Sequence, residues 1–415
     1  MSSSYPESKA GSAACARVAL GLGLALGGAC AGESAVAAEV YVQPRADLQA
    51  EVDTNRNFLS TGPTTTSEGY AGDVGALWGI ATPLSDTTFR AQVGYVDFPK
   101  DHQKAAEGSA DLASTYDSQR SDFSITGRFD RSDTYSSELA SALFNPVVPT
   151  SPTTPETGLV TTNTLRTLGY VEPSYAYKLS PRLRVGVSGL YENTDYSGDF
   201  ASQYVSFDYK VGRVFVAWAA TPLTGIGFSP FVSRDAAKSG GAVTTASGVN
   251  LDLDHKWSAT FSGKLELTGE RDDASQPLLT PPKVRSNNFG AVYTSQWTGQ
   301  TGSVQLSGGR TFTPSGSGGK YRDDQIQLEY DQKLSARTSA TYAVRDVNAE
   351  PLVAAQGGAY KYLEAVAGLK WLATRTCYLS AGIKYQRLHY GGVPSAAGNG
   401  MAYVGIGYQG LGKRP

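Results

Sequence analysis

Histidine, cysteine and serine are the residue types that could support catalysis or metal binding in this chain. A Ser/His/Asp-type hydrolase needs a histidine placed between a serine and a carboxylate. His102, His255 and His389 are widely separated, and none has a serine at a sequence spacing that would indicate a catalytic pair. Cys15 and Cys30 lie in a segment predicted to be removed, and the remaining Cys377 and three dispersed histidines make no zinc-ligand cluster. The sequence therefore predicts no enzyme, no metal site and no cofactor.

One segment superficially resembles a phosphate-binding loop. Residues 315–320 read SGSGGK. A phosphate loop needs an earlier glycine at fixed spacing, a Ser or Thr after the lysine, and a following helix, and none of these is present. We interpret the segment as a flexible loop.

The chemistry that the sequence does repeat is an alternation of charged and apolar residues. From Val40 onward, Val, Ala and Leu alternate with Gln, Arg, Asp and Glu up to Val52, and similar runs begin near Phe89, Leu183 and Phe261. A period of two indicates strands with one apolar and one polar face. No segment has the 3.6-residue stripe of a helix, so the sequence predicts an all-β fold.

Two kinds of connection separate the strands. Short turns are expected at residues 82–86, 131–133, 179–182, 221–224, 255–258, 298–300, 333–336 and 373–375. Long Gly-, Pro-, Ser- and Thr-rich loops are expected at residues 53–67, 99–114, 145–163, 271–285 and 347–358. Short turns at one end and long loops at the other are typical of outer-membrane barrels, whose turns are periplasmic and whose loops are extracellular.

The spacing of the turns leaves two architectures to compare. A repeat of roughly 40 residues also occurs in β-propellers, but each repeat here holds two runs long enough to cross a bilayer at a tilt, and propeller signatures are absent. Eight turns join sixteen strands, and a first and a last strand bring the total to about 18. We predict a single antiparallel transmembrane β-barrel covering residues 39–415.

Polar residues on the strands are expected to face the lumen, because a charged group facing lipid costs about 2–4 kcal/mol near mid-depth. An 18-stranded barrel leaves an aqueous channel unless something plugs it. The alternative is that these charges pair across a packed lumen that conducts nothing. The predicted pore-lining residues are Arg45, Asp47, Gln49, Glu51, Arg90, Gln92, Arg128, Arg166, Glu172, Arg184, Lys264, Glu266, Glu329 and Lys384.

Aromatic residues support the same orientation. All five tryptophans lie in or just before a short turn, which is typical of an aromatic girdle at a membrane interface. A second group of aromatics, among them Tyr95, Phe98, Tyr191, Tyr204, Tyr321, Tyr360 and Tyr390, is expected at the opposite interface. The predicted girdle tryptophans are Trp78, Trp218, Trp257, Trp297 and Trp371.

Residues 1–38 have the composition of a signal peptide. Lys9 and Arg17 precede an apolar run, and a small-x-small cleavage pattern follows at Ala35 and Ala37. A lipoprotein with an acylated Cys30 is the less favoured alternative. Removal of this segment would leave Cys377 as the single cysteine, so no internal disulfide is expected. The formal net charge of −2 gives no basic face for nucleic acid.

Two short motifs relate the chain to a known group. Residues 53–59 read DTNRNFL, and residues 177–182 read YKLSPR. In its opening strand and its repeated turns the chain resembles the β-barrel porins of proteobacteria that accompany exopolysaccharide assembly systems. The resemblance implies an outer-membrane conduit for exporting surface polysaccharide, with periplasmic export components as partners.

Three functions remain open at this point. Export of polysaccharide is the first, and a lumen with both charge signs permits it. Passive diffusion of small hydrophilic solutes is the second, with residues 145–163 as a candidate constricting loop. The third is a structural or adhesive barrel acting through its outer loops. Outer-membrane lipid is an expected partner in all three.

Overall fold

A computed structural model describes residues 38–60, 64–138, 160, 164–275, 282–353 and 358–412. The chain divides into two units, Met1–Ala38 and Glu39–Pro415. The predicted signal peptide falls outside the described residues except for Ala38, and so does the candidate constricting loop except for Val160. None of the helices among the described residues is long and apolar enough to cross a membrane.

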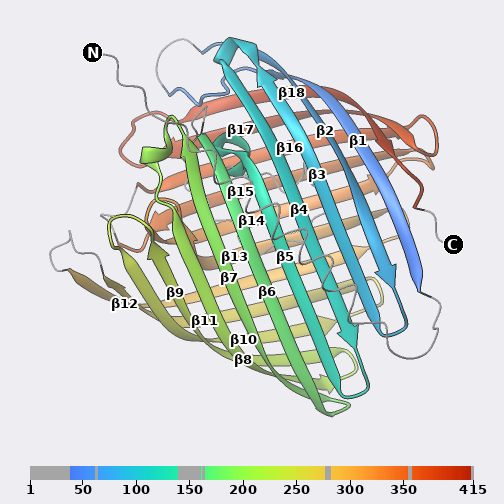
Figure 1. The fold of residues 1–415 in the computed structure, drawn as a ribbon, viewed down its shortest axis with the longest axis vertical. Helices are drawn as coiled ribbons and strands as arrows, with labels where there is room; N and C mark the ends of the chain where they lie inside the picture. The colour runs from blue at the N-terminus through green and yellow to red at the C-terminus, as the bar shows by residue number, and fades with distance from the viewer. Residues whose placement is uncertain are drawn as a thin grey trace, which may run out of the picture. The chain divides into compact units, whose positions relative to one another are not determined.

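Eighteen strands and three very short helices make up the described part of the second unit (Figure 1). The helices are η1 (Pro99–Asp101), α2 (Thr134–Ser137) and η2 (Ala201–Gln203). The strands are β1 (Glu39–Asp53), β2 (Ser67–Ala81), β3 (Ser85–Phe98), β4 (Gln103–Asp117), β5 (Ser121–Asp133), β6 (Thr164–Ser180), β7 (Leu183–Gly198), β8 (Phe207–Thr221), β9 (Thr224–Ala237), β10 (Val243–Lys256), β11 (Phe261–Ser275), β12 (Lys283–Thr298), β13 (Gly302–Ser315), β14 (Gly319–Lys333), β15 (Thr338–Pro351), β16 (Tyr360–Leu372), β17 (Cys377–Tyr390) and β18 (Ala397–Gln409).

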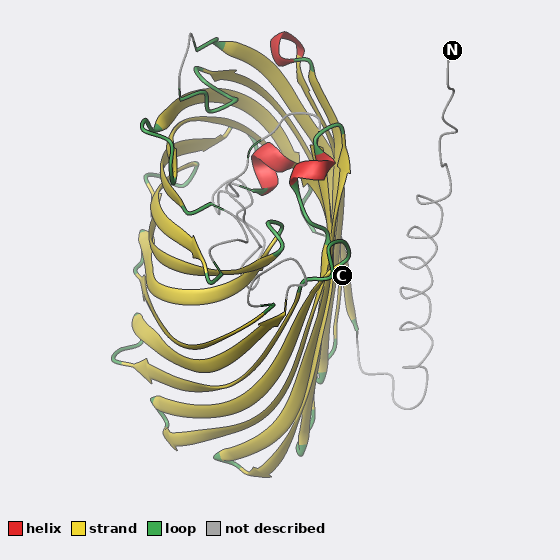
Figure 2. Cartoon of the chain, turned by 90° about the vertical axis from the view of Figure 1, so that its left-hand side faces the viewer, coloured by secondary structure: helices red, strands yellow, loops and turns green. Residues whose placement is uncertain are grey.

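The strands form one closed antiparallel barrel. Each strand pairs with its sequence neighbours, and β18 pairs with β1 from Arg45↔Gln409 to Asp53↔Met401. Figure 2 shows the strands curving into one wall, with the short helices toward one end. Closure pairs the first and last strands, which would otherwise be exposed edges. The predicted all-β barrel of about 18 strands is confirmed.

The alternation along each strand separates an outer apolar face from an inner polar face. On β1, Leu48 points outward and is 59% exposed, whereas Asp47 and Gln49 point the other way. On β3, Val93 is 63% exposed and its neighbour Gln92 lies inside. This arrangement is the reverse of a water-soluble protein, where large apolar side chains gather in the interior.

Seven of the eight predicted short turns join strands, and one was wrong. Residues 131–133 belong to the end of β5, where the hydroxyl of Ser132 donates to Asp130 at 2.7 Å. The turn between β4 and β5 instead lies at residues 118–120. There the Ser118 hydroxyl oxygen accepts the backbone N–H of Ser121 at 3.0 Å. The error arose because polar residues at a strand end have the same composition as a turn.

Several of the predicted long loops were longer than those in the structure. Most of residues 99–114 belong to β4, β11 continues to Ser275, and β15 continues to Pro351. In each case polar residues extend a strand beyond its apolar part, so the strand keeps its hydrogen bonds while its sequence loses the apolar signal. The loop after β1 was correct, since β1 ends at Asp53 and β2 begins at Ser67.

Candidate pore and its mouth

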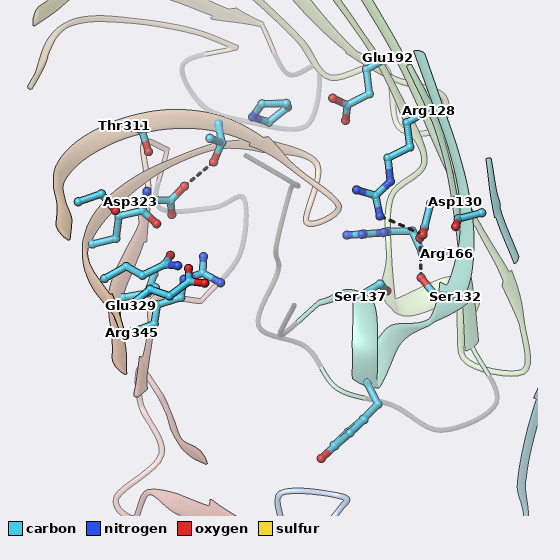
Figure 3. A pocket seen from close by; sticks show the side chains of 18 of the residues that line it. Arg128, Asp130, Ser132, Ser137, Arg166, Glu192, Thr311, Asp323, Glu329 and Arg345 are labelled. Carbon is cyan, nitrogen blue, oxygen red and sulfur yellow. Dashed lines mark hydrogen bonds and ion pairs between the residues drawn. The ribbon is translucent and has the colours of Figure 1, made fainter. Parts of the chain in front are cut away.

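A cavity of about 1180 Å³ lies inside the barrel. Its wall is polar and carries both charge signs. Figure 3 shows Arg128 and Asp130 on one side, with Asp323 and Glu329 facing them from the other. These residues come from β5 and β14, which lie on different parts of the wall. The cavity is therefore enclosed by strands from well-separated parts of the barrel wall.

The structure brings ten of the fourteen predicted pore residues to the described lining of this cavity. The other four lie off that lining. Glu172 accepts a hydrogen bond from Arg213 at 3.1 Å, and Lys264 contacts Asp252 at 3.0 Å. Arg184 contacts Asp122 near the short turns, and Arg90 lies opposite Asp111 on β4. The residues on the lining are Arg45, Asp47, Gln49, Glu51, Gln92, Arg128, Arg166, Glu266, Glu329 and Lys384.

Several lining charges are paired with close neighbours along the wall. Arg45 contacts Asp47 at 2.5 Å, and Arg128 contacts Asp130 at 3.3 Å. Each pair joins residues two apart on one strand, so it leaves the middle of the lumen open. Paired charges keep the wall hydrophilic while limiting any strong field of one sign.

Further lining residues were missed at the level of sequence. Arg213, Asp323 and Arg345 line the cavity, and each sits at an inward position of its strand. Strict extension of the alternation to every strand would have found them. Among the described residues, no group of three or more His, Cys, Asp or Glu side chains could hold a metal ion.

Helix α2 narrows one end of the lumen. It follows β5 directly, and Tyr135 from this helix lines the cavity although its side chain is buried. The Tyr135 hydroxyl lies 3.4 Å from Asp53 and 3.3 Å from Gln386, and it accepts a hydrogen bond from Asn399 at 3.0 Å. The helix is thus tied to β1, β17 and β18, on a different part of the barrel wall.

Arg56 connects this helix to the loop after β1. Its guanidinium carbon lies 3.4 Å from the ring centre of Phe98 and 4.0 Å from that of Tyr135. It also contacts Asp53 at 2.9 Å and Asp133 at 3.8 Å. A buried cation needs such partners, because taking a charge out of water costs several kcal/mol. We call Asp53, Arg56, Gln103, Asp133, Tyr135, Gln386 and Asn399 the mouth network.

Burial raises the pKa of Tyr135 well above its usual range, and the nearby Asp53 carboxylate raises it further. Arg56 opposes this shift without reversing it. The phenol therefore stays neutral and keeps its proton for hydrogen bonding. No local sequence pattern indicates this network, because its members come from residues 53 to 399.

The β13–β14 hairpin approaches the lumen from another side. Residues Thr311 to Pro314 line the cavity. Lys320, on the returning strand, contacts Glu270 at 2.7 Å and Asp272 at 3.0 Å, and all three side chains are buried. The backbone N–H of Val205 donates to the carbonyl of Gly316 at 2.6 Å. These contacts hold the hairpin inward, so the predicted flexible loop at residues 315–320 is in fact anchored.

The five tryptophans lie at the short-turn end, and each is 41–50% exposed. Their role as a girdle stays a prediction. Tyr95 and Tyr191 are exposed near the other end, in keeping with a second ring. Phe98, Tyr204, Tyr321 and Tyr360 were assigned wrongly to that ring. They are buried, and Tyr321 and Tyr360 belong to an apolar cluster with Phe58 and Tyr135.

No family model and no curated protein matches the chain. Solved structures that resemble it include OccK2 (OpdF) of Pseudomonas aeruginosa in complex with glucuronate, at 10% identity and a TM-score of 0.47, covering 90% of this chain and 99% of that one. OpdK of the same organism with vanillate has 10% identity, a TM-score of 0.46 and the same coverage. OccAB3 of Acinetobacter baumannii has 9% identity, a TM-score of 0.45 and the same coverage. Glucuronate and vanillate are bound by the first and second of these proteins, respectively.

Proposed function

We propose that this protein is an outer-membrane channel through which small hydrophilic solutes diffuse passively. The observation that supports this most directly is the polar cavity of about 1180 Å³ enclosed by a barrel whose outer face is apolar. Strands of 13–17 residues exceed the ~9–11 that cross a bilayer at a tilt. An outward apolar face is stable in lipid, and an inward charged face is stable in water.

The narrowing of the lumen favours small solutes over a polymer. Helix α2 and the β13–β14 hairpin both contribute residues to the cavity lining. Tyr135 of the helix packs against the buried cation of Arg56, and the hairpin is anchored by the buried cation of Lys320. The cavity is only slightly larger than the ~300–1,000 Å³ of typical small-molecule pockets. A polysaccharide chain would need a wider bore past both elements than a small solute does. We therefore favour the diffusion hypothesis over the export function that the sequence resemblance implied.

The mixture of charges on the wall predicts weak ion selectivity. The electric fields of the two charges in pairs such as Arg45–Asp47 and Arg128–Asp130 largely cancel at a distance. Solutes without a large net charge would meet little electrostatic resistance. The third hypothesis, a barrel acting through adhesive outer loops, has no specific observation in its favour.

The proposal is tested with the purified full chain in lipid bilayers and liposomes. We expect a steady ionic conductance with similar cation and anion permeability. We also expect arabinose to swell liposomes faster than a maltose oligosaccharide does. Absence of conductance from folded protein would overturn the proposal, as would equal permeation of sugars of every size.

A second experiment separates diffusion from export. Deletion of the gene should leave cell-surface and secreted polysaccharide unchanged and should slow the uptake of small sugars. A large loss of polysaccharide, restored by the intact gene, would favour the export hypothesis instead.

A further inference from the structure

Strands β12 and β13 are not hydrogen-bonded along their whole length. Strand β12 pairs with β11 along its length, from Phe261↔Trp297 to Ser275↔Lys283. Its pairing with β13 runs only from Thr298↔Ser303 to Ala291↔Arg310. Within the described residues, positions 283–290 of β12 thus have strand partners on one side only, and so do positions 311–315 of β13. Figure 1 lets the reader follow the two strands.

A glycine lies at the point where the two strands separate. Gly309 has φ +153°, and a Cβ atom there would clash with the carbonyl oxygen of Ala291. Such a conformation is essentially restricted to glycine. Beyond it, β13 leaves β12 and continues into the inward hairpin anchored by Lys320. The separation is therefore coupled to the element that narrows the lumen.

A groove of about 560 Å³ lies on the outside of the barrel at this separation. Phe289 and Ile326 give it apolar surface and are 63% and 55% exposed. Its polar surface includes Asp346, Asn348 and Arg310, which binds Asp324 in a bidentate manner at 2.6 and 2.9 Å. The groove is thus amphipathic, with one cation and two carboxylates among its lining residues.

The groove adjoins the lumen. Arg310 and Gln325 line both the groove and the internal cavity. Above Ala291 the β12–β13 ladder has no backbone pairs, just as the β4–β5 ladder has none beyond Gly108↔Arg131. Ala291 is six residues from Trp297, or roughly 20 Å along a strand at ~3.3 Å per residue. Since such strands are tilted by ~35–45°, this corresponds to roughly 15 Å of height, so the groove lies within the apolar band of about 25 Å.

We propose that this groove is a lateral portal through which a small amphiphile passes between the lumen and the outer leaflet of the membrane. This inference rests on the proposed membrane channel. The amphiphile would have an apolar or aromatic body, which fits Phe289 and Ile326. Its head group would be neutral or cationic, because Asp324 and Asp346 outnumber Arg310 in the lining.

The competing use of the free edge of β12 is pairing with another protein by strand addition. The side chains of Lys283 and Arg285 stand on this edge segment and are exposed, with Arg285 contacting Asp273 at 2.5 Å. Charged residues on an edge are a common means of preventing such pairing. We therefore favour a portal.

The test fills the groove from outside without altering the lumen. Ala291 and Asn348 line the groove but do not appear on the described lining of the cavity, so Ala291→Trp and Asn348→Trp should block it. Ala381→Trp is the matched control, because Ala381 points outward and is exposed but lies on a strand paired on both sides. Folding of each full-length variant is checked by its heat-modifiable electrophoretic mobility.

The probe is N-phenyl-1-naphthylamine, a neutral aromatic amphiphile whose fluorescence rises on entering a membrane. Gram-negative cells expressing the wild-type chain or Ala381→Trp should take it up several-fold faster than cells with either groove variant. Arabinose-driven swelling of liposomes should be equal for all four proteins. Fast uptake through folded Ala291→Trp and Asn348→Trp would overturn the portal, and so would cross-linked oligomers joined through the free edge of β12. Absence of arabinose swelling in the wild type would instead count against the proposed channel.

Discussion

Arg56 offers the most direct test of how the lumen is narrowed. Replacement by methionine keeps much of the apolar stem but removes the charge that lies between Phe98 and Tyr135. The variant leaves the carboxylates of Asp53 and Asp133 buried without this cation. We therefore expect helix α2 to leave its position inside the lumen much more often.

The magnitude follows from the burial of the pair. Removing one member of a buried ion pair typically costs about 3–5 kcal/mol, because the other member is left uncompensated. At about 1.4 kcal/mol for each factor of ten, the equilibrium between the held and released helix shifts roughly a hundred- to several thousand-fold. The barrel itself should remain folded, since no β-ladder hydrogen bond is lost.

Single-channel recording in planar bilayers measures this shift. Arg56→Met should show a new level of higher conductance that is occupied for most of the time. Arg184→Met is the control, because Arg184 is 54% exposed and its pair with Asp122 at 3.5 Å lies off the cavity lining. An exposed pair contributes at most about 1 kcal/mol, so its conductance should match the wild type.

A double variant sharpens the argument. Adding Asp53→Asn to Arg56→Met removes one orphaned charge but keeps a hydrogen-bonding side chain at position 53. Since deleting both members of a buried pair costs less than deleting one, the higher level should become rarer again. An Arg56→Met channel that conducts like the wild type would refute the assigned role of the mouth network.

Three other predictions concern the mouth, the point of strand separation and the hairpin. The held position of helix α2 favours neutral Tyr135, because the pKa of Tyr135 is raised there. Conductance should therefore be constant up to the ordinary tyrosine pKa of about 10 and should rise above that pH, where a released tyrosine loses its proton. A titration of conductance against pH checks this, and the Tyr135→Phe variant should lose the alkaline rise. Gly309→Ala should destabilise the barrel by about 1–3 kcal/mol in urea unfolding because of its positive φ, whereas Gly269→Ala, with open space at its Cβ position, should unfold like the wild type. Lys320→Met should leave the buried carboxylates of Glu270 and Asp272 without their cation, which destabilises the anchored hairpin by about 3–5 kcal/mol. Protease should then cleave the hairpin faster than it does in the exposed control variant Lys333→Met; equal cleavage of the two variants would contradict the anchoring role.

The barrel could be predicted from sequence because each strand residue meets only one of two solvents. Leu48 faces outward and Asp47 inward, and the polarity of each side chain alone predicts which way it faces. Once the period of two was recognised, the turns set the number of strands. The same logic failed at Arg131 and Asp133, where the strand continues with polar residues on both faces and resembles a turn.

The mouth and the strand separation could not be predicted for a different reason. Arg56, Tyr135 and Asn399 are distant in sequence and meet only because the barrel closes. A local pattern carries no information about such contacts. Gly309 likewise reads as one glycine among 47, and only its backbone geometry shows that the strands part there.

The two inward elements are held in the same manner, which bears on what their charges contribute. Arg56 with Asp53 and Lys320 with Glu270 are buried ion pairs, and such pairs add little net stability because desolvation offsets their attraction. Their effect is instead to penalise any arrangement in which one charge loses its partner. The barrel's stability then resides in its closed ladder and lipid-facing surface, while these pairs fix the shape of the lumen. Variants of the pairs should accordingly alter permeation more than folding.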